Sequence, residues 1–298
     1  MDSNLKDDSK DLLRLIKSKF PRLSKGQKLI SEYILNNYDK AAFMTAAKLG
    51  AAVGVSESTV VRFATELGFS GYPKLQKALQ ELIKNKLTTV QRLELSEEYS
   101  DVGYALKAVL KADIENIRST LEKINYNTFE EVVNKIFEAK RIYILGLRSS
   151  TALAEFLGFY LNIILQNVKT VSYGISDIFE QMINVGEGDL VIGIGFPRYA
   201  SRTIDALSFT KDRGAVVVAI TDSLLSPLAS KADYTLIAQS NMASFVDSLV
   251  APLSVINALI ISVGMREKNN ITNVFNNLEE IWTNYNVYSY NNRNVSDD

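Results

Sequence analysis

The sequence predicts an all-α domain over residues 1–87 and an α/β domain over 102–286, joined by a polar linker at 88–101. In the first part, apolar residues recur at helical spacing, with polar caps between the helices. In the second, short continuous apolar runs alternate with helical segments, which is typical of a parallel sheet covered by helices on both faces. The net charge also differs between the two parts. Residues 1–90 hold 15 Lys and Arg against 9 Asp and Glu and are basic, whereas the rest holds 18 against 25 and is acidic.

Caps and apolar periodicity predict the first helices of the N-terminal domain. Residues 12–20 form a short amphipathic segment, and a longer helix begins after Ser24. Gln27 follows three residues later, as in a capping box, in which each side chain binds the other residue's backbone N–H. A brief helix over 39–44 then leads into the next pair of helices.

A helix-turn-helix is predicted around Gly54, which can adopt the positive φ that a sharp turn requires. Thr45 caps a helix over 46–53, and Ser56 caps the second helix. An apolar stripe on the second helix consists of Val60, Phe63, Ala64 and Leu67. Spacing and capping alone leave two interpretations open, a DNA-binding helix-turn-helix and a small structural pair of helices.

The polar face of the second helix suits the major groove of DNA. Short hydroxyl side chains allow close approach there, and an arginine can bind a guanine edge or a phosphate. A further helix over 74–86 adds lysines that either hold the phosphate backbone or face solvent. The predicted DNA-binding residues are Thr45, Ser56, Glu57, Ser58, Thr59, Arg62, Tyr72, Lys74 and Lys77. The positive charge of the N-terminal third supports this interpretation.

A long amphipathic helix is predicted from residue 102, after the linker. Its position suits packing across the two domains or at the seam of a dimer. Its apolar residues are Leu106, Val109, Leu110, Ile114, Ile117 and Leu121.

Alternating helices and strands make up the remainder. The predicted strands are 141–147, 169–173, 189–196, 215–222 and 234–238. The predicted helices are 129–139, 151–165, 178–185, 201–213, 227–232, 245–265 and 274–285. Together they predict a five-stranded parallel sheet of the flavodoxin or Rossmann type. The tail over 287–298 is rich in Asn and Ser and is expected to be disordered.

In such sheets, ligands bind beyond the carboxyl ends of the strands. Three of these ends are rich in glycine or hydroxyl residues, at 146–151, 195–203 and 221–227. A glycine turn, hydroxyls and a helix N-terminus bind an anion well, because free N–H groups and the helix dipole face it. Arg148, Arg198 and Arg202 add positive charge. Helix capping is the alternative for each cluster, but two such ends with arginines in one sheet favour an anion site.

Composition excludes several kinds of chemistry. The chain has no cysteine and no histidine, so it has no disulfide and no zinc site of the His/Cys type. It has no Walker A loop, and Gly193-Ile194-Gly195 lacks the third glycine of a dinucleotide fingerprint, so no cofactor or metal is expected. No apolar run is long enough to span a bilayer, and residues 1–10 lack a signal-peptide core, which predicts a cytoplasmic protein.

These motifs resemble those of a known family. The N-terminal part resembles the helix-turn-helix domain of the RpiR (MurR/RpiR) family of bacterial transcriptional regulators, through Gly54-Val55-Ser56, Thr59-Val60-Val61-Arg62-Phe63 and Leu67-Gly68-Phe69-Ser70-Gly71-Tyr72. The second half resembles that family's SIS (sugar isomerase) domain, through Phe196-Pro197-Arg198-Tyr199, Thr221-Asp222-Ser223 and Ser226-Pro227-Leu228-Ala229. The resemblance implies a DNA-binding regulator whose SIS domain senses a phosphorylated sugar or a related metabolite.

The resemblance also implies where the effector binds. Ser149 and Ser150 match the family's first phosphate-binding turn, and Ser201 and Thr203 match the second helix start. Many SIS domains have a serine where this chain has Gly195, so Arg198 is expected to hold a phosphate in its place, and an effector without a phosphate stays open. The predicted effector residues are Arg148, Ser149, Ser150, Arg198, Ser201, Thr203 and Ser223.

The leading hypothesis is thus a regulator of carbohydrate metabolism genes, not an enzyme, that binds double-stranded operator DNA as a homodimer or homotetramer. The alternative is a sugar-phosphate isomerase with an accessory helical domain. Without histidine, such an enzyme would need a lysine or carboxylates such as Asp177, Glu180 and Asp247 to move a proton. A protein-binding adaptor is a third possibility. The effector, the operator, the regulated genes and the sign of regulation do not follow from the sequence.

Overall fold

The structure is a computed structural model that describes residues 8–83, 90, 102–242 and 245–288. The chain divides into two compact units, Met1–Ser100 and Asp101–Asp298, each with its own fold. Most of the predicted linker, and the predicted tail beyond Tyr288, lie outside the described residues.

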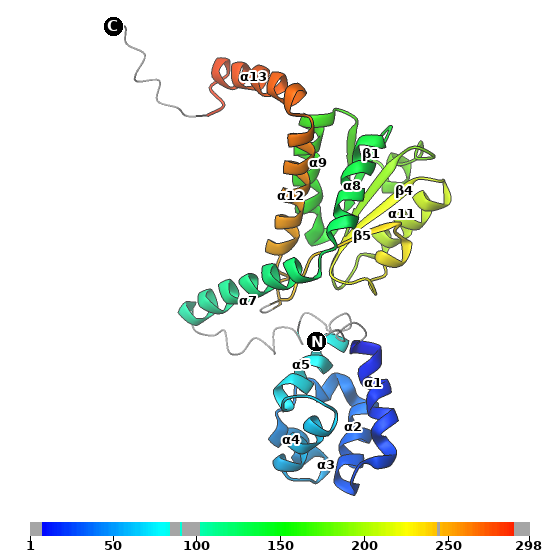
Figure 1. Cartoon of the computed structure of the whole chain (residues 1–298), viewed down its shortest axis with the longest axis vertical. Coiled ribbons are helices and arrows are strands. Elements are labelled where there is room, and N and C mark those ends of the chain that lie inside the picture. Colours follow the sequence, from blue (N-terminus) through cyan, green and yellow to red (C-terminus); the bar gives the residue numbers. More distant parts are fainter. Residues whose placement is uncertain (1–7, 84–89, 91–101, 243–244, 289–298) are drawn as a thin grey trace. The chain divides into compact units, whose positions relative to one another are not determined.

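Helices packed around one apolar core form the first unit (Figure 1). They are α1 (Asp8–Lys19), α2 (Lys25–Ala41), α3 (Ala46–Val53), α4 (Glu57–Glu66) and α5 (Tyr72–Ile83), with a 3-10 turn at Phe20–Arg22. Each helix contributes fully buried side chains, among them Ile16, Ile30, Leu49, Phe63, Leu75 and Leu79. The all-α prediction is confirmed. The separate short helix predicted at 39–44 is confirmed in part, because the non-helical backbone of Asn37 (φ −139°, ψ 41°) divides α2 into two pieces, of which the second ends at Ala41.

Side-chain caps set the starts of α2 and α3. The Ser24 hydroxyl accepts from the Gln27 N–H at 3.4 Å, and the Gln27 side chain accepts from the Ser24 N–H at 3.0 Å. The Thr45 hydroxyl accepts from the Lys48 N–H at 3.2 Å. Both predicted caps are therefore confirmed, and each satisfies backbone donors that a helix start leaves without a partner.

The turn between α3 and α4 depends on two glycines. Gly54 ends α3 with φ of 73°, the left-handed conformation that the sequence predicts. Gly50 permits the chain to fold back closely, because a Cβ there would lie 2.7 Å from the carbonyl oxygen of Val55. A side chain at Gly50 would therefore push the turn, and α4 with it, away from α3.

Five parallel strands form the sheet of the second unit, in the order β2-β1-β3-β4-β5. The strands are β1 (Ile142–Gly146), β2 (Val168–Val171), β3 (Leu190–Ile194), β4 (Val216–Thr221) and β5 (Tyr234–Ile237). The interior strand β1 pairs with β2 from Ile142 opposite Val168, and with β3 from Ile142 opposite Leu190. The prediction of a five-stranded parallel sheet is confirmed.

Helices cover both faces of this sheet (Figure 1). One face packs against α8 (Tyr126–Glu138), α9 (Thr151–Leu165) and α12 (Val250–Arg266). The other packs against α10 (Ile178–Gln181) and α11 (Ser201–Asp212). Short 3-10 turns lie at Arg148–Ser150 and Ala229–Lys231, where the second replaces the helix predicted over 227–232. The last helix is α13 (Lys268–Asn284), which starts earlier than predicted.

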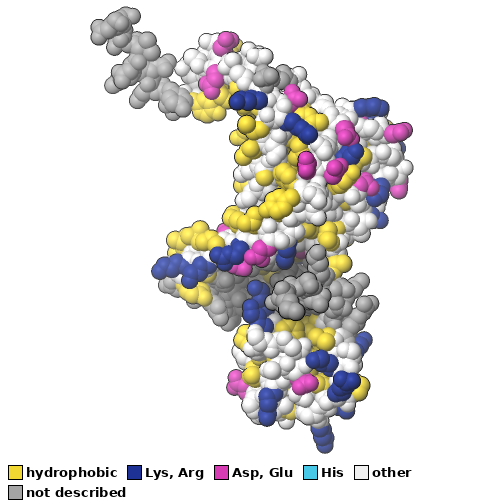
Figure 2. All heavy atoms as spheres, viewed as in Figure 1, with side chains coloured by type: hydrophobic (Ala, Val, Ile, Leu, Met, Phe, Trp, Pro, Cys, Tyr) yellow, Lys and Arg dark blue, Asp and Glu magenta, His cyan; other side chains and the backbone are white. Residues whose placement is uncertain are grey.

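Helix α7 (Val102–Lys123) opens the second unit and leaves much of its apolar surface uncovered. Its exposed apolar side chains, visible along the helix in Figure 2, are Val102, Leu106, Val109, Leu110, Ile114, Ile117 and Leu121. Five of these recur three to four residues apart and so form one stripe, namely Leu106, Leu110, Ile114, Ile117 and Leu121.

In the part of the chain that the structure describes, no single helix is long and apolar enough to cross a membrane. One bent pair, Val250–Arg266 with Ile271–Asn284, passes that test by length and composition, with a bend of 107°.

Candidate functional site

Helix α4 turns opposite faces to the core and to solvent. Val60, Phe63 and Ala64 are fully buried, as the apolar stripe predicts. The outer face exposes Glu57, Ser58, Val61 and Arg62, and Thr59 is half-buried at its edge. Helix α4 is thus anchored by one face and offers a polar, singly basic face for contact.

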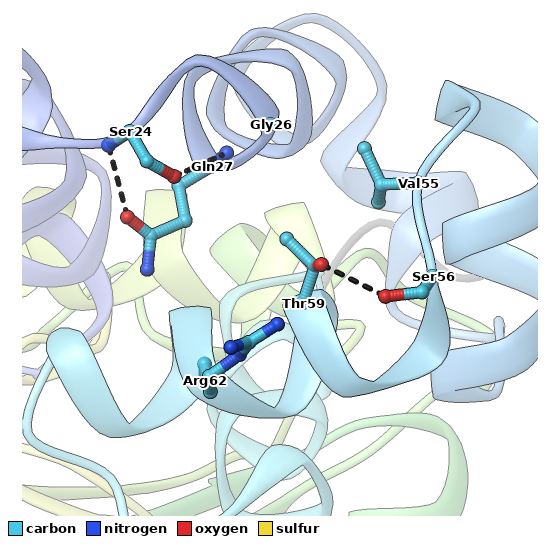
Figure 3. A pocket seen from close by; sticks show the side chains of 7 residues that line it. All are labelled: Ser24, Gly26, Gln27, Val55, Ser56, Thr59 and Arg62. Atoms are coloured by element: carbon cyan, nitrogen blue, oxygen red, sulfur yellow. Dashed lines mark hydrogen bonds between the residues drawn. The ribbon is translucent and has the colours of Figure 1, made fainter.

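A hollow of about 510 Å³ separates the start of α2 from the start of α4 (Figure 3). It is lined by Ser24, Gly26, Gln27, Val55, Ser56, Thr59 and Arg62. Gly26 allows the close packing of the two helices, because a Cβ there would lie 3.3 Å from Val55 Cγ1. The N-terminus of α2 therefore belongs to the same face as α4. From their spacing, Ser24 and Gln27 are predicted only as caps, although a helix N-terminus beside a polar helix face is itself a signal for anion binding.

Three hydroxyls cluster at the start of α4. Ser56 stands at the N-cap position but makes no capping bond, so the predicted cap is wrong in this detail. Its Oγ instead lies 2.9 Å from both Ser58 Oγ and Thr59 Oγ1. The hydroxyl of Ser56 is thus drawn away from the first N–H groups of α4, which suits binding of an external anion at that helix start.

Arg62 borders two hollows. Besides the one shared with α2, it lines a second of about 610 Å³ together with Glu57, Ser58 and Val61. Its Nε donates to the Ser58 carbonyl at 3.2 Å, which holds the side chain along the helix. The guanidinium therefore extends over the outer face, where it can reach a base edge or a phosphate.

Tyr72 is placed differently from the prediction. It is only 4% exposed, and its hydroxyl donates to the Met44 carbonyl at 2.7 Å. Burial raises the pKa of the Tyr72 hydroxyl to about 12. A phosphate contact by Tyr72 does not fit this placement, because the side chain anchors α5 to the chain before α3.

The other predicted DNA contacts are accessible. Thr45 is exposed and also caps α3, and Lys74 and Lys77 are exposed on α5. Among the described residues, no hydrogen bond ties these lysines to α4, so they extend the basic surface without completing the hollow described above.

The strand order places a candidate site in the second unit. Strands β1 and β3 are neighbours, yet the chain leaves them toward opposite sides of the sheet, to β2 and to β4. Such a switch point opens a crevice beyond the carboxyl ends of the strands. The loop that contains Arg148, Ser149 and Ser150 follows β1, and the loop that contains Arg198 follows β3, so both lie at this switch point. Ser223 follows β4, one strand further along.

The loop after β1 is tightly folded. Arg148 has φ of 59°, an uncommon conformation for a non-glycine residue. Gly146 permits the fold, because a Cβ there would lie 2.6 Å from the Ser150 carbonyl oxygen. Arg148 and Ser149 are exposed, whereas Ser150 is buried.

The loop after β3 has the same character. Phe196 and Pro197 are buried, and Arg198 is exposed with φ of 63°. A Cβ on Gly195 would lie 2.8 Å from Leu228 Cδ2, so the buried Leu228 takes the room that a serine side chain would need. The chain therefore presents an arginine, not a serine, at this strand end.

The hydroxyl groups of Ser201, Thr203 and Ser223 differ in exposure and in hydrogen bonding. Ser201 is exposed at the first turn of α11, whereas Thr203 is buried and its Oγ1 has no hydrogen-bond partner among the described residues. The Ser223 hydroxyl accepts from the Leu225 N–H at 3.1 Å within its own turn. Arg202 forms an ion pair with Asp177 and stacks over the Phe179 ring, so it is already engaged.

Within the described ranges, no group of three or more Asp and Glu side chains has an arrangement that would hold a metal ion.

Two family models match separate parts of the chain. The one described as a helix-turn-helix domain of the rpiR family matches residues 10–86. The one described as a SIS domain matches residues 135–262. These matches fall on the two units of the structure, and on the two candidate sites.

Known proteins resemble this chain over one or both parts. The sugar isomerase domain of an RpiR transcription factor from Sphaerobacter thermophilus is 31% identical, with 58% of this chain and 96% of that chain covered and a TM-score of 0.55. The transcriptional regulator HexR of Pseudomonas aeruginosa is 26% identical over 268 residues, 86% of this chain and 90% of HexR. NanR of Vibrio vulnificus, solved in complex with ManNAc-6P, is 20% identical, covers 94% of this chain and 100% of that chain, and has a TM-score of 0.55, which shows a shared fold. The helix-turn-helix unit, the SIS sheet and these likenesses together show that the chain belongs to the RpiR family of transcriptional regulators.

Proposed function

We propose that this protein is a transcriptional regulator that binds operator DNA through α4 and the start of α2, and a sugar phosphate at the carboxyl edge of its sheet. The observation that carries the DNA interface is the outer face of α4. Its apolar side is fully buried, so the exposed hydroxyls and Arg62 are held on a fixed helix beside a second helix N-terminus. A rigid helix with short polar side chains and one arginine suits the major groove.

The DNA interface is tested by measuring the affinity of the full chain for its upstream intergenic DNA at fixed salt. Arg62→Ala is expected to weaken binding about 10- to 100-fold, the usual worth of an arginine at a base edge. Lys40→Ala is the matched control, because Lys40 is exposed in the last turn of α2, roughly 20 Å along the helix from its N-terminus. Equal losses in both variants would reduce the role of Arg62 to general charge, and unchanged affinity in Arg62→Ala would refute the interface.

The effector proposal rests on the two loops at the switch point. Each loop presents an exposed arginine, Arg148 or Arg198, beyond a strand end, and Ser149 and Ser201 lie exposed beside them. NanR, which shares the fold, binds a sugar phosphate, ManNAc-6P. The test is calorimetric titration of the full chain with glucose 6-phosphate, fructose 6-phosphate and ManNAc-6P, each paired with its unphosphorylated sugar. Binding that requires the phosphate supports the proposal. Equal binding of the free sugar would contradict it and would indicate an effector without a phosphate.

A non-catalytic role for this sheet is supported by what its carboxylates already do. Asp177 caps α10 and pairs with Arg202, and the Glu180 side chain accepts from the Asp177 N–H at 2.9 Å. Both are therefore held in structural bonds rather than aimed at a substrate as a general base. Conversion of glucose 6-phosphate to fructose 6-phosphate by the purified chain would favour the isomerase alternative.

A homodimer, acting in the cytoplasm on a two-fold symmetric operator, completes the proposal. The exposed apolar stripe on α7 is the surface that a second copy would cover, since it is large for a surface left in water. Light scattering on Ile114→Glu is expected to show a shift toward monomer. Lys107→Glu, on an exposed position of the same helix, is the control. A dimer that is unchanged in Ile114→Glu would exclude α7 as the seam.

A further inference from the structure

A hydrogen-bonded path begins at the loop after β3. The Tyr199 hydroxyl donates to Asp222 Oδ1 at 2.7 Å, which ties the residue after Arg198 to the end of β4. The Gln239 side chain in turn donates from Nε2 to the Asp222 carbonyl at 2.9 Å. Three neighbouring strand ends are thus linked at the same edge of the sheet, on the side where the effector is proposed to bind.

The path continues from the sheet to α7. The Gln239 N–H donates to the Thr120 hydroxyl at 2.8 Å, and Lys123 donates from Nζ to Gln239 Oε1 at 3.3 Å. Both Thr120 and Gln239 are buried. A bond between buried groups is costly to leave unmade, so a shift of Gln239 is carried to α7 rather than absorbed by water.

A second set of polar bonds holds the same half of α7. Asn116 and Asn241 exchange two bonds, from the Asn116 side chain to the Asn241 carbonyl at 2.8 Å and from the Asn241 N–H to Asn116 Oδ1 at 3.1 Å. The Ser248 hydroxyl donates to Asp113 Oδ1 at 2.6 Å. Directional bonds of this kind fix one position of the helix against the sheet, whereas its apolar stripe stays exposed.

We propose that Asp222, Gln239 and Thr120 are positioning residues that couple the effector loop to α7, and through it to DNA binding. The proposal rests on the proposed function, since it assigns a regulatory path to the same effector site. Tyr199 is the sensor end, because it follows Arg198 in the loop that an anion would engage. Helix α7 is the output end, because in the sequence it follows the segment that joins the two units. An effector that moves the loop would thereby favour one of two positions of α7.

The first experiment needs no effector. Hydrogen exchange is measured on the full chain of Tyr199→Phe, which removes one hydroxyl and keeps the ring. Backbone amides over residues 113–123 and 238–241 are expected to exchange about 2- to 10-fold faster, the net worth of one hydrogen bond. Tyr143→Phe is the matched control, because Tyr143 is buried in β1 of the same sheet and lies outside the path. Unchanged exchange in Tyr199→Phe would overturn the path and leave the proposed function intact.

The second experiment measures the change in DNA affinity that glucose 6-phosphate, fructose 6-phosphate or ManNAc-6P produces. In wild type, an allosteric response is expected to lie at about 5- to 150-fold. Thr120→Val should reduce this response several-fold while sugar-phosphate binding and DNA affinity without effector stay near wild type. Thr120→Ser, which keeps the hydroxyl, should restore it.

The outcomes separate the two proposals. If Thr120→Val binds the sugar phosphate and responds like wild type, the path is wrong although the sensor is right. If no sugar phosphate alters DNA binding in wild type, the proposed effector class fails, and the path is then judged by the exchange experiment alone.

Discussion

The two edges of the sheet use arginine differently. At the amino edge, Arg141 binds Asp189 with two bonds, from Nε at 3.0 Å and from Nη2 at 2.8 Å. At the carboxyl edge, Arg148 and Arg198 are exposed, and both have a positive φ. Arg141 thus holds strand starts together. Arg148 and Arg198 are instead held in unfavourable backbone conformations and are accessible to solvent. Strained backbone persists where the surrounding structure enforces it, often at functional sites, so the carboxyl edge is the better candidate for ligand binding.

Two further hydrogen bonds tie Asp189 and Arg141 to the neighbouring backbone. The Asp189 side chain is fully buried and accepts from the Gly186 N–H at 3.0 Å, and Arg141 donates as well to the Asn184 carbonyl at 2.6 Å. The hydrogen bond to Asp189 raises the pKa of the Arg141 guanidinium.

The largest expected effect comes from breaking this closed edge. Asp189→Ala removes the acceptor of three donor bonds and is expected to lower the free energy of unfolding by about 2–3 kcal/mol. Urea denaturation measures it, with Asp189→Asn as the control that keeps one acceptor oxygen and should lose less. If Asp189→Ala costs no more than a surface substitution, the contrast between the two edges fails.

The second largest effect is expected at the carboxyl edge. Arg198→Ala is expected to weaken binding of the sugar phosphate that titrates best by about tenfold or more, because a charge-assisted bond to the phosphate is lost. Its urea midpoint should change little, in contrast to Asp189→Ala. Calorimetry measures the affinity, and Arg213→Ala, on an exposed arginine that ends α11, is the control for net charge. Equal weakening by both substitutions would mean that Arg198 acts only through the field of the domain.

The features that local sequence determines were predictable, and those that depend on distant contacts were not. The caps at Ser24 and Thr45 and the turn at Gly54 follow from residue type over a few positions, and the five strands follow from continuous apolar runs. The anchoring role of Tyr72 was not predictable in this way, because its partner Met44 lies 28 residues away in the chain. The bond between Thr120 and Gln239 joins residues 119 positions apart, so no local sequence pattern predicts it.

The candidate effector site shows the same limit at finer scale. Its hydroxyls and arginines were predictable because they follow strand ends, but their separate roles were not. Ser223 is engaged in its own turn and Thr203 is buried, and neither outcome has a signature in residue type. A positive φ at an arginine has none either, since the surrounding contacts impose it.

The smallest expected effect tests that strain directly. A non-glycine residue in the left-handed region costs about 1–2 kcal/mol, and glycine gives back part of the gain through its greater freedom in the unfolded chain. Arg148→Gly is therefore expected to raise the free energy of unfolding by about 0.5–1 kcal/mol while it weakens sugar-phosphate binding. Arg148→Ala removes the same charge but keeps a Cβ at φ of 59°, so it should weaken binding without the gain in stability. A gain in both variants would mean that the lost charge raises the stability. A gain in Arg148→Gly alone would show that this edge gives up stability to hold an arginine where the ligand is proposed to bind.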